Sequence, residues 1–168
     1  MIPKVLKGFN LFIDGKGYAG LVEEVNLPKL DLKMDEIYNG GMDTPIDLEM
    51  GMSKLECDFT LSEYNTDVIK LFGLRDGAQV KLTMRGALDD EAGVVPVVVK
   101  VKGAMKDLDM GGFKSGEKAP LKSSMTLREY KLKIGPDILV DIDVLNMTRI
   151  INGVDQLASM RDAIKVGA

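Results

Sequence analysis

Hydrophobic and polar residues alternate along most of this chain, and a period of two predicts strands with one dry face and one wet face. The clearest example is Leu30, Leu32 and Met34, which charged residues separate. The segments predicted as strands are 9–13, 18–25, 29–37, 54–61, 79–88, 94–105, 122–134 and 138–144. This pattern favours a mainly β fold, an antiparallel β-sandwich or barrel with one or two short helices.

The alternation is irregular at two places inside predicted strands. The apolar phase slips by one residue between Leu127 and Tyr130, which predicts a β-bulge or bend near Arg128 and Glu129. Gly103, within the most β-branched run of the chain, indicates a second bulge.

Two segments have the features of short helices instead. Asn65 predicts a helix cap, and Gly73 predicts the end of that helix. Near the C-terminus, Asn152 predicts the cap of a helix over 152–165. One face of this predicted helix is a stripe of residues at helical spacing, formed by Leu157, Met160, Arg161 and Ile164. An amphipathic terminal helix either packs on its own domain or contacts a neighbouring protein, and the sequence leaves both open.

The segment 40–52 is too long and too apolar for an ordinary turn between two strands. It carries only three carboxylates, and methionine suits an adaptable contact surface. We therefore expect a long loop that buries its apolar side chains, either on its own domain or on a neighbouring subunit. The residues of interest are Gly40, Gly41, Met42, Pro45, Ile46, Leu48, Met50 and Met52.

Composition narrows the possible functions. A chain of 168 residues that is 45% hydrophobic predicts a single domain over 1–168 with a sizeable core. The net charge of −4 argues against a nucleic-acid-binding protein, which needs a basic surface. There is no histidine, and the single cysteine, Cys57, fits a buried apolar position. We therefore expect no enzyme, no cofactor and no metal site.

Three motifs suggest a catalytic or binding function, but a structural explanation is favoured for each of them. Gly15, Gly17 and Gly20 match a dinucleotide fingerprint, but the next segment reads as a strand, so a hairpin is predicted. The glycine spacing of 111–116 resembles a phosphate-binding loop that lacks its lysine. Asp141 and Asp143 share a strand face, which is usually a solvated face.

No signal peptide or long apolar run is present, so we expect a soluble intracellular protein that does not insert into membranes.

Six short segments together resemble the major tail-tube protein of contractile-tailed bacteriophages and R-type bacteriocins. They occur in the same order and at compatible spacing along nearly the whole chain. The segments are 10–15 (NLFIDG), 27–30 (LPKL), 40–43 (GGMD), 116–118 (GEK), 142–146 (IDVLN) and 151–157 (INGVDQL).

The resemblance implies a structural protein rather than an enzyme. Such subunits form six-membered rings that share strands in an inner barrel and stack into a tube. A contractile sheath surrounds the tube and drives it through the bacterial envelope. The implied partners are further copies of the chain, the sheath, the baseplate and a tail terminator, with DNA as non-specific cargo. The implied location is a virion tail or bacteriocin particle, assembled in the host cytoplasm. The long loop would then bridge adjacent rings.

A ring of six would carry six times the net charge of −4, and an acidic channel would let DNA slide without binding. The wet faces of the predicted strands are the candidates for the channel wall. They carry Asp31, Lys33, Asp35, Glu56, Asp58, Lys81 and Arg85, so the wall would be mixed in charge. Two rival hypotheses are a monomeric barrel that binds a small ligand and the inner tube of a type VI-like secretion system.

Overall fold

The strand β9 (Leu121–Ile134) organises the computed structural model, which describes residues 1–75 and 79–165. Along one edge, β9 pairs with β8 (Gly93–Asp109) over almost its whole length. Along its other edge, the first half pairs with β6 (Glu56–Leu61) and the second half with β10 (Asp137–Asp143). The sheet therefore forks at β9, and every pairing in it is antiparallel.

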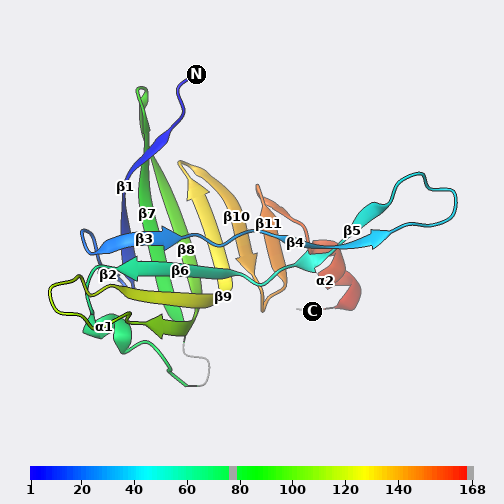
Figure 1. The fold of residues 1–168 in the computed structure, drawn as a ribbon. Helices are drawn as coiled ribbons and strands as arrows, with labels where there is room; N and C mark the ends of the chain where they lie inside the picture. The colour runs from blue at the N-terminus through cyan, green and yellow to red at the C-terminus, as the bar shows by residue number, and fades with distance from the viewer. Residues whose placement is uncertain (76–78, 166–168) are drawn as a thin grey trace.

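The two branches of the fork complete a sheet of ten strands. One branch continues from β10 to β11 (Thr148–Ile151) and β12 (Val154–Asp155), and the other from β6 to β3 (Val22–Asn26). Beyond β8, the sheet continues through β7 (Val80–Asp90), β1 (Val5–Ile13) and β2 (Lys16–Gly17). In Figure 1, β3 and β6 cross in front of β1, β7 and β8, which gives the two layers of a sandwich.

The core lies between these two layers. Phe59 and Leu61 of β6 are buried against residues such as Leu11 of β1 and Leu82 of β7. Cys57 belongs to the same cluster, as its apolar neighbours in the sequence predict. The predicted antiparallel β-sandwich is confirmed for the described residues.

A close contact between β8 and β9 marks the fork. Lys102 pairs with Glu129 and Gly103 pairs with Leu127, so Arg128 is the extra residue of a β-bulge. A Cβ placed on Gly103 would lie only 2.0 Å from the carbonyl oxygen of Thr126. Both irregularities predicted from the sequence, at Gly103 and near Arg128, are confirmed and form one feature.

Local sequence signals explain two further elements. The side chain of Asn65 accepts hydrogen bonds from the amides of Asp67 (3.0 Å) and Val68 (3.3 Å), and so caps helix α1 (Thr66–Ile69). Asp14 and Gly15, with φ of 49° and 84°, form the two-residue turn between β1 and β2. This turn is that of a hairpin and not of a dinucleotide-binding motif, as predicted. The predicted return strand over 18–25 is wrong, because β1 pairs with the two-residue β2 and β3 pairs with β6.

Three further predictions from the sequence are wrong: the structure of segment 40–52, the start of the C-terminal helix and the number of strands. The segment 40–52 is not a single loop, because β5 (Ile46–Met52) pairs with β4 (Leu32–Ile37) in a separate two-stranded sheet. Helix α2 (Ala158–Ile164) begins later than predicted, because Asn152 has φ of 49° in a turn between β11 and β12 rather than capping a helix. The described residues hold twelve strands instead of about eight, since the prediction missed β5, β11 and the two-residue strands.

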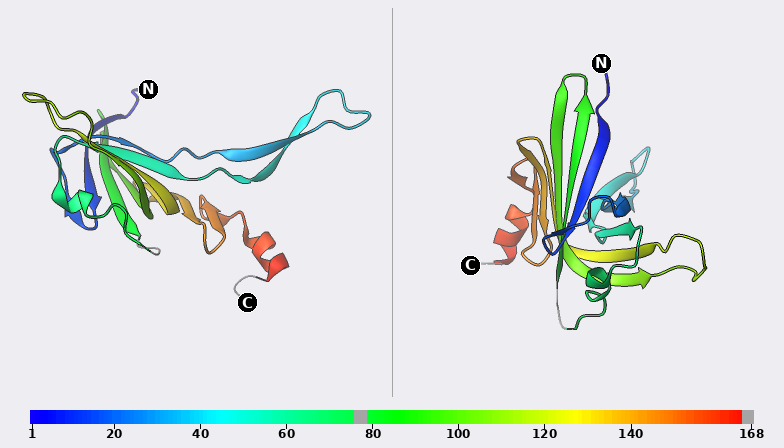
Figure 2. Two further views of the ribbon diagram at one scale, coloured as in Figure 1. Left: turned by 60° about the horizontal axis from the view of Figure 1, so that its bottom comes forward. Right: turned by 90° about the vertical axis from the view of Figure 1, so that its left-hand side faces the viewer.

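The β4–β5 hairpin projects from the sandwich as an arm, which we define as Leu32–Met52. Figure 2 shows it extending well beyond the other elements, with helix α2 below its base. Among the described residues, the two strands of the arm pair with each other and with no strand of the ten-stranded sheet.

We expect Gly103→Ala to destabilise the subunit by about 3 kcal/mol, because the added methyl group overlaps the backbone of β9. Chemical unfolding followed by circular dichroism measures the change. Gly8→Ala is the matched control, since Gly8 also lies at a register shift within a strand but has open space around it. Equal stability of the two variants would contradict the importance of this contact.

Candidate assembly surfaces

The arm exposes apolar side chains on both faces. Directly opposite residues share a face, so Ile37 with Ile46, and Asp35 with Leu48, define one face. Met34 and Glu49 lie on the other. The large apolar residues that are more than two-fifths exposed are Met34, Tyr38, Ile46, Leu48 and Met50. A two-stranded hairpin has no core of its own, so these side chains are available to another surface.

The base of the arm is fixed to the sandwich by an ion pair. The guanidinium group of Arg149 on β11 lies 2.6 Å from a carboxylate oxygen of Glu49 on β5, and the Arg149 side chain is only 12% exposed. At the same end of the hairpin, the backbone and the hydroxyl group of Ser53 both donate hydrogen bonds to Asp31. The direction of the arm is therefore set by polar contacts at its base.

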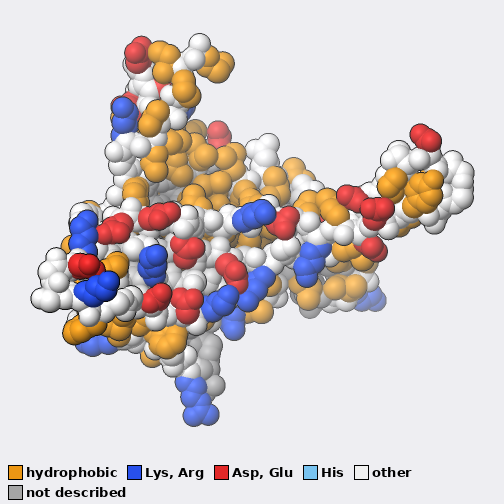
Figure 3. All heavy atoms as spheres, in the orientation of Figure 1, with side chains coloured by type: hydrophobic (Ala, Val, Ile, Leu, Met, Phe, Trp, Pro, Cys, Tyr) orange, Lys and Arg blue, Asp and Glu red, His pale blue; other side chains and the backbone are white. Residues whose placement is uncertain are grey.

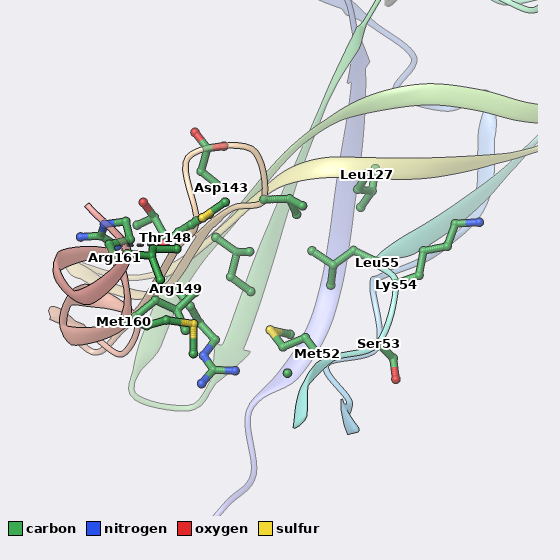
Figure 4. A pocket seen from close by; sticks show the side chains of 16 residues that line it. Met52, Ser53, Lys54, Leu55, Leu127, Asp143, Thr148, Arg149, Met160 and Arg161 are labelled. Carbon is green, nitrogen blue, oxygen red and sulfur yellow. Dashed lines mark hydrogen bonds between the residues drawn. The ribbon is translucent and has the colours of Figure 1, made fainter. Parts of the chain in front are cut away.

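An apolar pocket of about 350 Å³ lies between the arm base and helix α2. In Figure 4, Met52 and Leu55 face the pocket from one side, and Met160 and Arg149 face it from the other. Lys54 and Ser53 point away from it. The pocket joins the predicted loop and the predicted interface helix, two regions that lie about a hundred residues apart in the chain.

Helix α2 is held by polar contacts rather than by burial. Leu157, Met160, Arg161 and Ile164 all line the pocket, so the predicted stripe does form one surface. None of the helix residues is buried, and Met160 and Ile164 are 62% and 57% exposed. Arg161 donates a hydrogen bond to the carbonyl oxygen of Met147 (2.9 Å) and forms an ion pair with Asp155. This pair lowers the pKa of Asp155 and raises that of Arg161.

The candidate channel residues do not form one surface. Asp31, Glu56 and Asp58 line a shallow pocket on the outer face of β6. Lys33 and Asp35 lie on the arm. Lys81 and Arg85 alternate with the buried residues of β7, in the opposite layer of the sandwich. Which of these faces lines a channel remains a prediction.

The pocket on β6 is a balanced charged surface. Glu56 lies 3.3 Å from the amino group of Lys106 and 3.4 Å from that of Lys54. Their hydrogen bonds lower the pKa of Glu56. Beneath this surface, burial raises the pKa of the Cys57 thiol to about 12, so the thiol stays protonated and is a poor nucleophile.

A second charged surface was missed in the sequence. On the outer face of the main sheet, Lys81 lies opposite Lys102, and Lys102 lies opposite Glu129. In the neighbouring row, Lys100 lies opposite Lys131. Polar and apolar residues alternate in the segments 94–105 and 122–134, which indicates a solvent-exposed face on each strand. Only the strand order shows that the charged residues of these faces are adjacent.

The sandwich also has an open side. In the described part of the chain, β3 pairs only with β6, and β1 pairs beyond β7 only at Phe12 and Ile13. An apolar groove of about 450 Å³ lies between these two strands. It is lined by residues that include Leu6, Phe9, Val25, Leu27, Val97 and Ile134. Hydrophobic side chains gather above β3 in Figure 3, at the place where this groove opens.

The described residues contain no group of three or more acidic, cysteine or histidine side chains placed to hold a metal ion. None of the helices in residues 1–75 and 79–165 has the length and hydrophobicity needed to span a membrane. What the arrangement offers is contact surface: an apolar arm, an open groove and two charged faces.

Comparisons with known proteins give a consistent result. The model of the family described as phage tail tube protein FII matches residues 3–164. The chain is 32% identical over 165 residues to the tail tube protein of Escherichia phage P2, covering 95% of this chain and 96% of that one. It is 26% identical over 147 residues to the major tail tube protein of Serratia phage KSP20, covering 86% and 85%.

Two solved structures share the fold. One is a chain in the structure of the sheath/tube terminator of an extracellular contractile injection system, with a TM-score of 0.56 at 12% identity, covering 78% of this chain and 96% of that one. The other is a chain of the sheath–tube complex of the same system in its extended state. It has a TM-score of 0.56 at 12% identity and covers 74% and 87%.

We expect Glu49→Gln to loosen the arm, because Arg149 then lacks its ionised partner. The loss of stability should be below about 1 kcal/mol, since Glu49 is partly exposed. Hydrogen exchange of the β4 and β5 amides should nevertheless become faster. Asp47→Asn is the matched control, because Asp47 lies on the same strand and forms no ion pair within the described residues. An unchanged exchange rate in Glu49→Gln would mean that the pair does not hold the arm.

We also expect the attachment of helix α2 to depend on pH. The pKa of Asp155 is lower in the folded chain than in the unfolded chain, where it is about 4. The stabilisation that Asp155 gives to helix α2 is therefore present above this unfolded-state pKa, and it is lost as the pH falls through the folded-state pKa. Exchange of the α2 amides between pH 3 and pH 7 measures this. Asp155→Asn should lose this pH dependence and exchange fast even at pH 7, whereas Asp162→Asn should keep the parent profile. Identical profiles for both variants would contradict the assignment.

Proposed function

Because this chain belongs to the phage tail tube protein FII family, we propose that it is the subunit from which the inner tube of a contractile tail is assembled. The observation that carries this proposal is the arm, whose strands pair only with each other in the described part of the chain and which exposes apolar side chains beyond the sandwich. A monomer has no use for such a surface, whereas a polymer of identical subunits covers it with the next copy. The proposed unit is a single tail-tube domain over 1–168, in which 76–78 and 166–168 lie outside the described residues.

The open side of the sandwich supports a closed ring. The outer edges of β1 and β3 leave backbone groups without strand partners, and the groove between them is apolar. Exposed edges of this kind favour pairing with further strands, and a ring removes the exposed edge altogether. We propose that six copies share strands in this way and complete one another's barrel.

The arm supports stacking of the rings. A contact between two different surfaces of the same subunit repeats without limit and makes a filament. Ile46, Leu48 and Met50 would become buried in each repeat. Burial of about 100 Å² of apolar surface contributes about 2.5 kcal/mol before the costs of association.

The proposed role is mechanical rather than catalytic. The finished tube is driven through a bacterial envelope when a surrounding sheath shortens, and it then conducts DNA or ions. The names of related proteins support such partners, because one matched structure is a sheath–tube complex and another is a sheath/tube terminator. Sheath, baseplate and terminator are the proposed partners, and the particle is a virion tail or a bacteriocin of the same construction.

A shortened arm tests the proposal. Met34 lies directly opposite Glu49, so residues 35–48 can be replaced by an Asn-Gly turn that keeps the Arg149 ion pair. We expect the variant to fold with unchanged stability and to form no tubes, as seen by negative-stain electron microscopy. Long tubes of this variant, or sedimentation of the parent protein as a single species near 18 kDa at high concentration, would contradict the proposed function.

A further inference from the structure

The molecule carries a second exposed apolar feature at the end opposite the arm. It is the loop 110–120, which joins β8 to β9. Figures 1 and 2 show the arm and this loop at opposite ends of the long axis of the subunit, with helix α1 beside the loop. Two complementary surfaces at opposite ends of a subunit meet when copies line up head to tail.

The loop presents an aromatic side chain to solvent. Phe113 is 95% exposed, which is unusual for a phenylalanine in a subunit with so few aromatic residues. The base of the loop is fixed, because the hydroxyl group of Tyr64 donates a hydrogen bond to the carbonyl oxygen of Met110 (2.6 Å). The carboxylate of Asp109 also accepts a hydrogen bond from the amide of Gly111 (2.8 Å). Phe113 is therefore held away from the core by a defined loop conformation.

A pocket of about 350 Å³ lies within this loop. Tyr64, Phe113 and Ala119 contribute its apolar lining, and Lys114 and Lys118 contribute positive charge. Neither lysine forms an ion pair within the described residues. The pocket thus combines an apolar surface with two cations for which the described part of the chain provides no ion-pair partner.

The tip of the arm has the opposite character. Pro45 and Ile46 are exposed, and Asp43 and Asp47 lie on either side of them in the sequence. The arm as a whole carries five acidic residues and one lysine. Its apolar tip is therefore flanked by carboxylates, whereas the apolar pocket at the opposite end is flanked by ammonium groups.

We propose that the pocket at Phe113 binds the arm tip of a second copy of this chain in the adjacent ring. This inference rests on the proposed function and adds to it the surface that receives the arm. Ile46 and Pro45 pack against Phe113 and Tyr64, while Asp43 and Asp47 approach Lys114 and Lys118. Such an arrangement buries the apolar surfaces of both ends and gives each lysine a carboxylate partner.

Two other apolar grooves among the described residues fit the arm tip less well. The groove between β1 and β3 has two carboxylates in its lining, Glu23 and Glu24, and one cation, Arg85, so its net negative charge would repel an acidic arm. The pocket beside α2 is formed partly by the base of the arm itself, and its two arginines already have carboxylate partners.

Charge reversal and rescue test the proposal. We expect Lys114→Glu with Lys118→Glu, and separately Asp43→Lys with Asp47→Lys, to abolish tube formation in negative-stain images. The four substitutions together should restore tubes, because the charges at the contact are complementary again. The matched control combines Asp43→Lys and Asp47→Lys with Lys100→Glu and Lys133→Glu, which are exposed on β8 and β9 and lie in neither proposed contact. It has the same net charge without the complementary contact, so it should form no tubes. Thermal unfolding of every variant checks that the subunit is folded.

A disulfide provides a second measurement. The variant with Ile46→Cys and Phe113→Cys cannot close a bond within one copy, because the two positions lie at opposite ends of the subunit, and Cys57 is buried. Oxidised tubes should give a ladder of linked chains on a non-reducing gel. The pair Ile46→Cys with Val94→Cys, placed instead at the exposed β7–β8 turn, should give none.

The results separate this inference from the proposed function. Tubes of normal length from the variant with Lys114→Glu and Lys118→Glu, or tubes of the cysteine variant without a ladder, would overturn the proposed receiving site. If the shortened arm still prevented assembly, the tube function would stand and the arm would bind elsewhere. Normal tubes from the shortened arm would overturn both.

Discussion

The close approach of β8 and β9 at Gly103 is the constraint on which the rest of the structure depends. Only a residue without a side chain allows the backbone of Thr126 to lie so near. At this point the bulge at Arg128 changes the partner of β9, from β6 before it to β10 after it. The β6 branch leads back to the arm, and the β10 branch leads on to helix α2. The arm and helix α2 are therefore both connected to the sheet through the branches that separate at this one backbone contact.

The contact also explains why the arm and helix α2 lie side by side. The two branches leave β9 at its middle, where the amide of Leu127 donates to Leu55 and the amide of Val144 donates to Arg128. Arg149 on β11 then forms an ion pair with Glu49 on the arm, and the pocket lined by Met52 and Met160 lies between the arm base and helix α2. The two branches of the sheet thus bring β11 close to the base of the arm, and the polar contacts there set the direction of the arm.

Much of this fold could be predicted from the sequence because its signals are local. Alternation located most strands, a change of phase located the bulge at Arg128, and the side chain of Asn65 indicated its helix cap. Alternation of Ile46, Leu48 and Met50 was equally visible, but the whole segment 40–52 was interpreted as one long apolar loop between two strands. The cap assigned to Asn152 failed because asparagine also suits the left-handed turn that it occupies here. The channel faces, the Arg149–Glu49 pair and the pocket at Phe113 depend on contacts between distant segments, which periodicity does not report.

The arm is already a hydrogen-bonded hairpin within a single subunit, and this affects how fast subunits join. A disordered segment must lose its conformational freedom when it binds, whereas a preformed hairpin has lost that freedom during folding. Most of the stabilisation from each new contact is then retained as affinity. In the proposed tube, growth would then be limited by how often correctly oriented subunits collide, and so by their concentration, rather than by a slow rearrangement after each collision.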